Sequence, residues 1–93
     1  MKRYIRSSTD LFKEKVYNAV AEYYYDHEDE ILEDYEDYKR KYNLYDTSLL
    51  QFLRDNLNYF DMAVMKAVPE QGKKGIFVLY GMDVEDLEEL LFS

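Results

Sequence analysis

The sequence contains no cysteine, only one proline and three glycines, and a single histidine. Without cysteine, neither a disulfide framework nor a thiolate zinc site can stabilise the fold, so a small hydrophobic core has to do so. No apolar run approaches the roughly 18 residues that span a bilayer. The N-terminal MKRYIRSSTD also has no apolar segment of a secretory signal behind its positive charges. We therefore expect a cytoplasmic protein.

The chain has few basic residues relative to acidic ones. Lysine and arginine number 12 against 20 aspartates and glutamates, which gives a formal net charge of -8. This balance argues against direct binding of nucleic acid or of an anionic membrane, and it favours a basic partner. At 93 residues, of which 47% are hydrophobic and 17% aromatic, the chain is too apolar to be disordered and predicts one folded domain over residues 1–93.

Residues 10–43 carry the clearest periodic signal. Apolar and aromatic side chains recur at helical spacing on one side, at Val16, Val20, Tyr23, Tyr24, Ile31, Tyr35, Tyr38 and Tyr42. Ser8 or Thr9 can cap this helix, and Asn43 is a plausible stop after three basic residues. Unbroken, the helix would be about 50 Å long. The alternative is a break near Asp26, which could itself be an N-cap.

The rest of the chain predicts a second helix, a hairpin and a last short helix. Thr47 or Asp46 can cap the helix LLQFLRDNL, and Asp83 can cap VEDLEELLF. Glycines 75 and 81 bracket five apolar or β-favouring residues, 76–80, which predict a strand.

A predicted strand needs a partner, and the nearest candidate is the segment 62–68. In that hairpin, Gly72 and Gly75 would frame Lys73 and Lys74 in the turn, and KRYIR near the N-terminus could add a third strand. The segment NYFDMAVMKAV also fits a continuing helix through Phe60, Val64 and Val68. The expected fold class is α+β and dominated by helix, with a β-hairpin or a small antiparallel sheet.

Acidic residues are concentrated in one part of the predicted long helix. Nine carboxylates and no base lie between positions 22 and 37. Seven of them share the side opposite the aromatic residues, and we call these seven the acidic stripe: Glu22, Asp26, Asp29, Glu30, Glu33, Glu36 and Asp37. One charge per roughly 2.5 Å of helix compares with one per about 1.7 Å along duplex DNA. A basic groove built for polyphosphate could accept such a stripe.

A second acidic group, at Asp83, Glu85, Asp86, Glu88 and Glu89, lies on the predicted C-terminal helix. In charge, size and chain organisation, the protein resembles the small acidic inhibitors that phages and mobile elements use against restriction and CRISPR nucleases. Some of these occupy the DNA-binding groove of their target. The resemblance implies an anti-CRISPR or anti-restriction inhibitor that acts as a nucleic-acid mimic, and it carries over no functional residue.

Eleven tyrosines are the second unusual feature. Tyr25 projects to the edge of the acidic stripe and, like Tyr35 and Tyr38, could anchor a partner, because tyrosine combines stiff contact area with a polar tip. The alternative interpretation is structural and assigns Tyr24, Tyr35, Tyr38 and Tyr42 to the core or to a dimer seam. The predicted partner-binding residues are Glu22, Tyr25, Asp26, Asp29, Glu30, Glu33, Glu36 and Asp37.

No sequence pattern predicts catalysis. The nucleophile-elbow and phosphate-loop motifs are absent. His27, Glu30 and Asp34 lie near one another on the helix, yet one imidazole and two exposed carboxylates lack the closed ligand set of a structural metal site. We therefore predict a protein that is not an enzyme, has no cofactor, no metal and no catalytic residue, and inhibits or regulates a nuclease or another nucleic-acid-binding protein. The alternative is a structural or regulatory oligomeric module, a homodimer included, joined through tyrosine-rich helix faces, with the acidic side merely solvated.

Overall fold

The computed structural model describes residues 8–92, with side chains from residue 11 onward. Within this range the chain forms helices, turns and loops and no strand. It forms six α-helices, α1 (Ser8–Asp26), α2 (Glu28–Tyr42), α3 (Leu49–Asp55), α4 (Asp61–Ala67), α5 (Gly72–Tyr80) and α6 (Val84–Phe92), and two short 3-10 turns, η1 (Leu57–Phe60) and η2 (Pro69–Gln71). The prediction of an α+β fold is therefore wrong.

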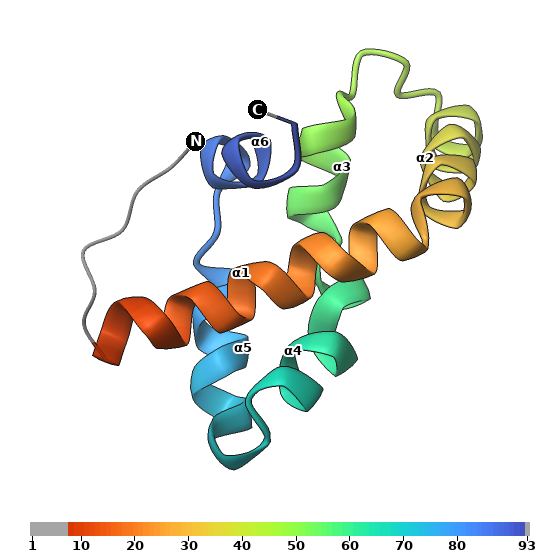
Figure 1. The fold of residues 1–93 in the computed structure, drawn as a ribbon. Coiled ribbons are helices and arrows are strands. Elements are labelled where there is room, and N and C mark those ends of the chain that lie inside the picture. The colour runs from red at the N-terminus through yellow and green to blue at the C-terminus, as the bar shows by residue number, and fades with distance from the viewer. Residues whose placement is uncertain (1–7, 93) are drawn as a thin grey trace.

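Helix α1 is the centre of the arrangement. Figure 1 shows it crossing the middle of the molecule, with α4 and α5 on one side, α3 and α6 on the other, and α2 leaving its C-terminal end. Its side chains Val16, Val20 and Tyr24 are completely buried. They meet a core drawn from every other helix, from η1 and from the turn between α5 and α6: Ile31, Phe52, Leu53, Leu57, Phe60, Val64, Leu79, Met82, Leu87 and Leu91. None of the helices in the described part of the chain is long and apolar enough to cross a membrane.

The predicted long helix bends at His27. This residue has a non-helical ψ of 24° and caps α2 without a side-chain hydrogen bond, so the alternative of a break near Asp26 is correct, although Asp26 is not the cap. His27 belongs to the hydrogen bonding of both helices, because its amide donates to the Tyr23 carbonyl (3.0 Å) at the end of α1 and its carbonyl accepts from the Ile31 amide (3.0 Å) at the start of α2. As predicted, Asn43 ends α2, in the left-handed conformation at φ 58°.

The predicted hairpin is replaced by two packed helices. Residues 76–80 belong to α5, the segment 62–68 lies almost wholly in α4, and the expected turn 72–75 is the first turn of α5. A run of five apolar residues fits a buried helix as well as a strand, so periodicity alone could not decide between them. The helical alternative for NYFDMAVMKAV is confirmed, with η1 before α4. The segment KRYIR lies outside the described residues.

The sequence also predicts the capping residues of two further helices. Asp83 caps α6 as predicted, and Asp83 and Asp86 exchange hydrogen bonds between side chain and backbone. The Asp83 carboxylate accepts from the Asp86 amide (2.9 Å), and the Asp86 carboxylate accepts from the Asp83 amide (3.1 Å). The cap of α3 is Ser48, whose hydroxyl oxygen accepts from the Gln51 amide (3.1 Å). The assignment of that cap to Thr47 or Asp46 is therefore wrong by one or two residues.

Helices α4 and α5 approach closely at a glycine. A Cβ atom at Gly75 would lie 2.6 Å from Val68 Cγ2 and 3.0 Å from Val64 Cγ1, both of them in buried side chains. A Cβ at Gly72, one turn earlier, would lie 3.7 Å from Met65 Cγ, an ordinary van der Waals distance. The two glycines of α5 therefore differ sharply in the space around them.

This difference gives a matched pair of variants. Gly75→Ala should lower the free energy of unfolding by about 1–3 kcal/mol, because overpacking outweighs the better helix propensity of alanine. Gly72→Ala should be neutral or stabilise by up to about 1 kcal/mol. Urea denaturation of both variants and the parent protein measures the effect. Equal stability of the two variants would contradict the close packing of α4 on α5.

Candidate functional site

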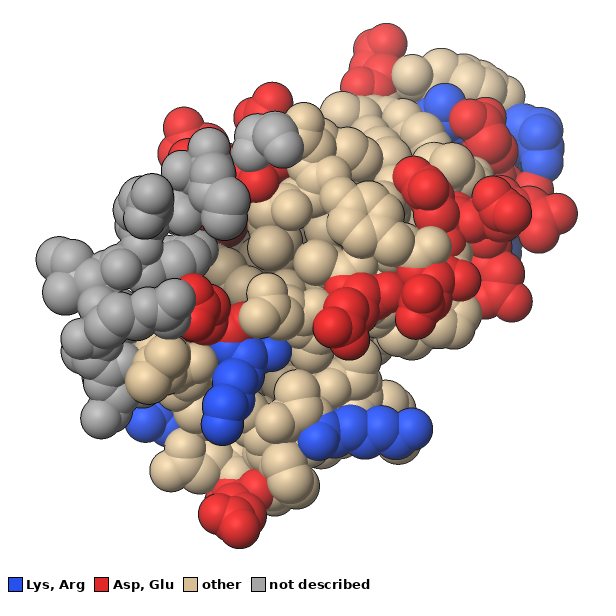
Figure 2. Space-filling view, viewed as in Figure 1, with Lys and Arg blue, Asp and Glu red and all other residues tan. Residues whose placement is uncertain are grey.

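The acidic stripe lies on the solvent side of α1 and α2. All seven of its side chains are exposed, and they divide between Glu22 and Asp26 on α1 and the remaining five on α2. His27 separates the two parts of the stripe, because the hydrogen bonding of α1 ends at its amide and that of α2 begins at its carbonyl. The stripe therefore continues from α1 onto α2 along a different helix axis. Figure 2 shows acidic atoms along the C-terminal half of α1 and onward over α2, at the right of the view.

Four of the nine carboxylates in this segment have partners within the chain. Glu36 pairs with Lys39 at 3.5 Å, and Asp37 pairs with Arg40. Two acids outside the stripe accept hydrogen bonds from tyrosine hydroxyls, Glu28 from Tyr24 (3.2 Å) and Asp34 from Tyr59 (2.7 Å). The charge that the segment offers to a partner is therefore smaller than the sequence alone indicates.

Five stripe carboxylates make no hydrogen bond or ion pair with any described residue: Glu22, Asp26, Asp29, Glu30 and Glu33. We call them the free carboxylates. Their spacing of three and four residues keeps them on one side of the helices. The basic residues at the end of α2 pair only with the last turn of the stripe, so the free carboxylates are the part of it that forms no ion pair with a described residue.

Tyr25 is half-exposed beside the stripe, as predicted, but its hydroxyl is not free. It donates a hydrogen bond to the Leu91 carbonyl at the end of α6, and its ring meets the edge of Tyr24 at a centroid distance of 5.4 Å. Tyr25 thus ties α1 to α6, and a partner could contact only its ring.

The two acidic groups of the chain are separate on the surface. In Figure 2, acidic atoms over α6 at the upper left are separated by uncharged surface from those on α2.

Tyr35 and Tyr38 contribute to packing between α2 and α3. Both are half-buried, and their rings lie 5.5 and 5.2 Å from that of Phe52. The Tyr35 hydroxyl donates to the Thr47 carbonyl (2.6 Å). Of the tyrosines assigned to the core or to a dimer seam, Tyr24 is buried and these two pack against the core, whereas Tyr42 is 55% exposed.

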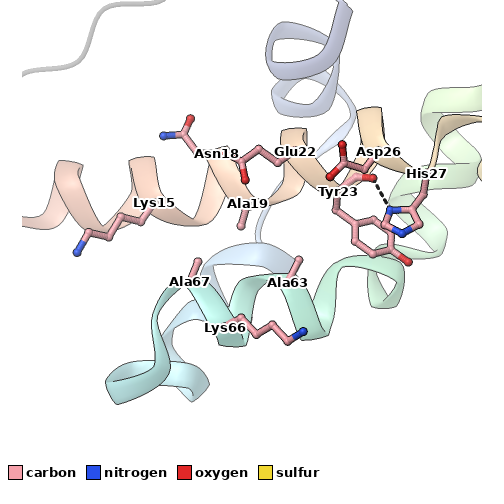
Figure 3. Close-up of a pocket in the computed structure, with 10 residues that line it drawn as sticks. All are labelled: Lys15, Asn18, Ala19, Glu22, Tyr23, Asp26, His27, Ala63, Lys66 and Ala67. Atoms are coloured by element: carbon pink, nitrogen blue, oxygen red, sulfur yellow. Dashed lines mark hydrogen bonds between the residues drawn. The ribbon is translucent and has the colours of Figure 1, made fainter.

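Sequence reasoning missed a groove of about 560 Å³ between α1 and α4. Figure 3 shows small side chains between the two helices and the stacked rings of Tyr23 and His27 at one end. Glu22 and Asp26 of the stripe border the groove, together with Lys15 and Lys66. The sequence could not reveal it, because the segment 62–68 fits a strand as well as a helix, and only the packing of α4 on α1 brings Ala63 and Ala67 to the groove.

The residues considered for metal binding do not form a site. Asp34 is engaged by Tyr59, and the His27 ring stacks on Tyr23 with its Nδ1 atom 3.0 Å from the Tyr23 carbonyl oxygen. Among the described residues, no three His, Asp or Glu side chains come together in a way that could hold a metal ion.

Comparison of the chain with protein-family models, with curated proteins and with solved structures gave no match. The geometry and charge of the chain itself are therefore the basis for inferring its function.

The tyrosine–carboxylate pairs predict a loss of stability at alkaline pH. Burial, and then the hydrogen bond to Glu28, raise the pKa of Tyr24 from 10.0 to about 12. The unfolded chain releases this proton near pH 10 and the folded chain only near pH 12, so the stabilisation is complete below pH 10 and is lost as the pH rises to 12. The stabilisation that is lost over this pH range is roughly 2–3 kcal/mol.

Urea denaturation of the parent protein and Tyr24→Phe between about pH 8 and 12 tests this linkage. The variant keeps the ring but not the hydroxyl, so its stability should fall less steeply with pH. Tyr45→Phe is the control, because Tyr45 is 61% exposed and its hydroxyl makes no hydrogen bond with the described residues. Parallel profiles for the parent protein and Tyr24→Phe would contradict the prediction.

Proposed function

We propose that the protein inhibits a nuclease or another nucleic-acid-binding protein by presenting the acidic stripe to its basic binding surface, as a DNA mimic does. The observation that carries the proposal is the set of free carboxylates, which follow one side of α1 and α2 and make no ion pair with any residue that the structure describes. A lysine- and arginine-rich groove that releases counterions from phosphates can release them equally from this set. Phage and mobile-element inhibitors of restriction and CRISPR nucleases are the class that this chemistry fits.

The energetics of the stripe support a binding role. Like charges three or four residues apart each destabilise a helix by a few tenths of a kcal/mol. The chain has basic residues that could relieve this repulsion, yet those on α2 are confined to its last turn, at Lys39, Arg40 and Lys41. A cationic surface placed against the free carboxylates would remove the repulsion and form new ion pairs. Contact with such a surface should therefore weaken as salt concentration rises.

The alternative was an oligomeric module joined through tyrosine-rich helix faces. It is less well supported, because the rings of Tyr35 and Tyr38 are already packed against Phe52. Tyr59 is likewise engaged, by the Asp34 carboxylate. These side chains contribute to the internal packing of the chain and offer little further area to a tyrosine seam.

Affinity capture from a lysate of the source organism at low salt, eluted with a salt gradient and analysed by mass spectrometry, identifies the partner. The test variant is the triple reversal Asp29→Lys, Glu30→Lys and Glu33→Lys, which removes three free carboxylates. The matched control carries the same change in charge at exposed acids elsewhere, Asp46→Lys, Glu85→Lys and Glu88→Lys. We expect the test variant to bind the captured partner at least about 100-fold more weakly, and the control to stay within about threefold.

Duplex DNA provides the second arm of the experiment. A mimic and DNA should exclude each other from the partner, and the logarithm of the binding constant should fall linearly with the logarithm of salt concentration. Equal weakening by the two triple variants would show that only net charge matters and would overturn the role of the stripe. A ternary complex with DNA would overturn mimicry while leaving the contact with a basic surface.

A further inference from the structure

Helices α4 and α5 carry an exposed apolar surface. Met62 and Met65 lie one turn apart on α4 and are 63% and 40% exposed, and Phe77 and Tyr80 lie one turn apart on α5 and are 81% and 44% exposed. We call these four residues the α4–α5 face. Exposed apolar side chains on two helices that pack against each other are typical of a site of interaction, and methionine, phenylalanine and tyrosine are among the residues enriched in interfaces.

The α4–α5 face is held in place by contacts beneath and beside it. The close approach of Gly75 to Val64 and Val68 fixes the distance between the two helices. The Tyr80 hydroxyl donates to the Asp61 carboxylate (3.1 Å to Oδ1) and joins the end of α5 to the start of α4. At the other end, Met65 lies against Gly72. The face is therefore a preformed surface, which lowers the entropic cost of binding.

The charges around this face differ from those of the rest of the chain. Residues 61–80 contain three lysines, at 66, 73 and 74, against only Asp61 and Glu70, whereas the whole chain has 20 acids against 12 bases. In Figure 2 basic atoms lie on the lower side of the molecule, where acidic atoms are few, and again at the upper right, where they lie among acidic atoms. Two copies with a net charge of -8 each repel one another. The repulsion is weakest where the α4–α5 faces meet.

We propose that a second copy of the chain packs on the α4–α5 face and forms a two-fold symmetric dimer. A two-fold interface is self-complementary, so each residue of the face meets the same surface of the other copy. The presence of both signs among residues 61–80 allows lysines of one copy to approach Glu70 of the other. This proposal does not rest on the proposed function, because it uses no residue of the acidic stripe.

Sedimentation equilibrium from about 5 to 500 µM tests the dimer. Phe77→Asp replaces the most exposed side chain of the face with a charge and should raise the dimer dissociation constant at least about 100-fold. Tyr45→Asp is the matched control, because Tyr45 is 61% exposed in the loop between α2 and α3, outside the face. Far-UV circular dichroism confirms that both variants remain helical.

Salt distinguishes this contact from the one proposed for the acidic stripe. Raising the salt concentration screens the repulsion between two acidic copies, so the dimer should hold or tighten, whereas stripe binding should weaken. The triple reversal at positions 29, 30 and 33 should leave the dimer intact. A monomer at every concentration would overturn the proposal, and so would a Phe77→Asp variant that dimerises like the parent protein. Equal dissociation by Tyr45→Asp would also overturn it.

Discussion

The fold depends on the burial of one side of α1. Val16, Val20 and Tyr24 are fully enclosed between α4 and α5 on one side and α6 on the other. Burying each such side chain contributes about 1.5–3 kcal/mol, which exceeds the few tenths of a kcal/mol lost at each like-charge pair of the stripe. Tertiary packing therefore holds the helix in place, and its solvent side can carry carboxylates that are not compensated by basic residues.

The bend at His27 reconciles the long acidic segment with a small core. A straight helix of this length would extend beyond the other helices and leave the aromatic side of α2 without a partner. The bend turns α2 so that Tyr35 and Tyr38 reach Phe52 of α3. Asp26 and Asp29 are exposed on either side of the bend, so the carboxylates continue from α1 onto α2 although the helical hydrogen bonding is interrupted at His27. The bend thus allows the aromatic side of α2 to be buried while its carboxylates stay in solvent.

Features with a local cause could be predicted from the sequence, and features with a tertiary cause could not. The end of α2 at Asn43 and the capping of α6 by Asp83 depend on backbone and side-chain chemistry within a few residues. Helix α5 was mistaken for a strand because Gly75 suggested a boundary, whereas its real role is the close approach to Val64 and Val68. The exposure of the stripe was predictable, but the pairing of Asp34 with Tyr59, 25 residues away, was not.

The distribution of charge relates the two proposed surfaces to each other. A partner that binds the stripe has to be basic, and it is therefore repelled by the lysines at positions 66, 73 and 74. A second copy is acidic overall, so the free carboxylates repel it more strongly than the proposed α4–α5 face does. Like-charge repulsion at each proposed surface thus disfavours the molecule that the other surface is proposed to bind. If the proposed dimer leaves the two stripes exposed, a basic partner with two binding grooves would engage both at a high effective concentration.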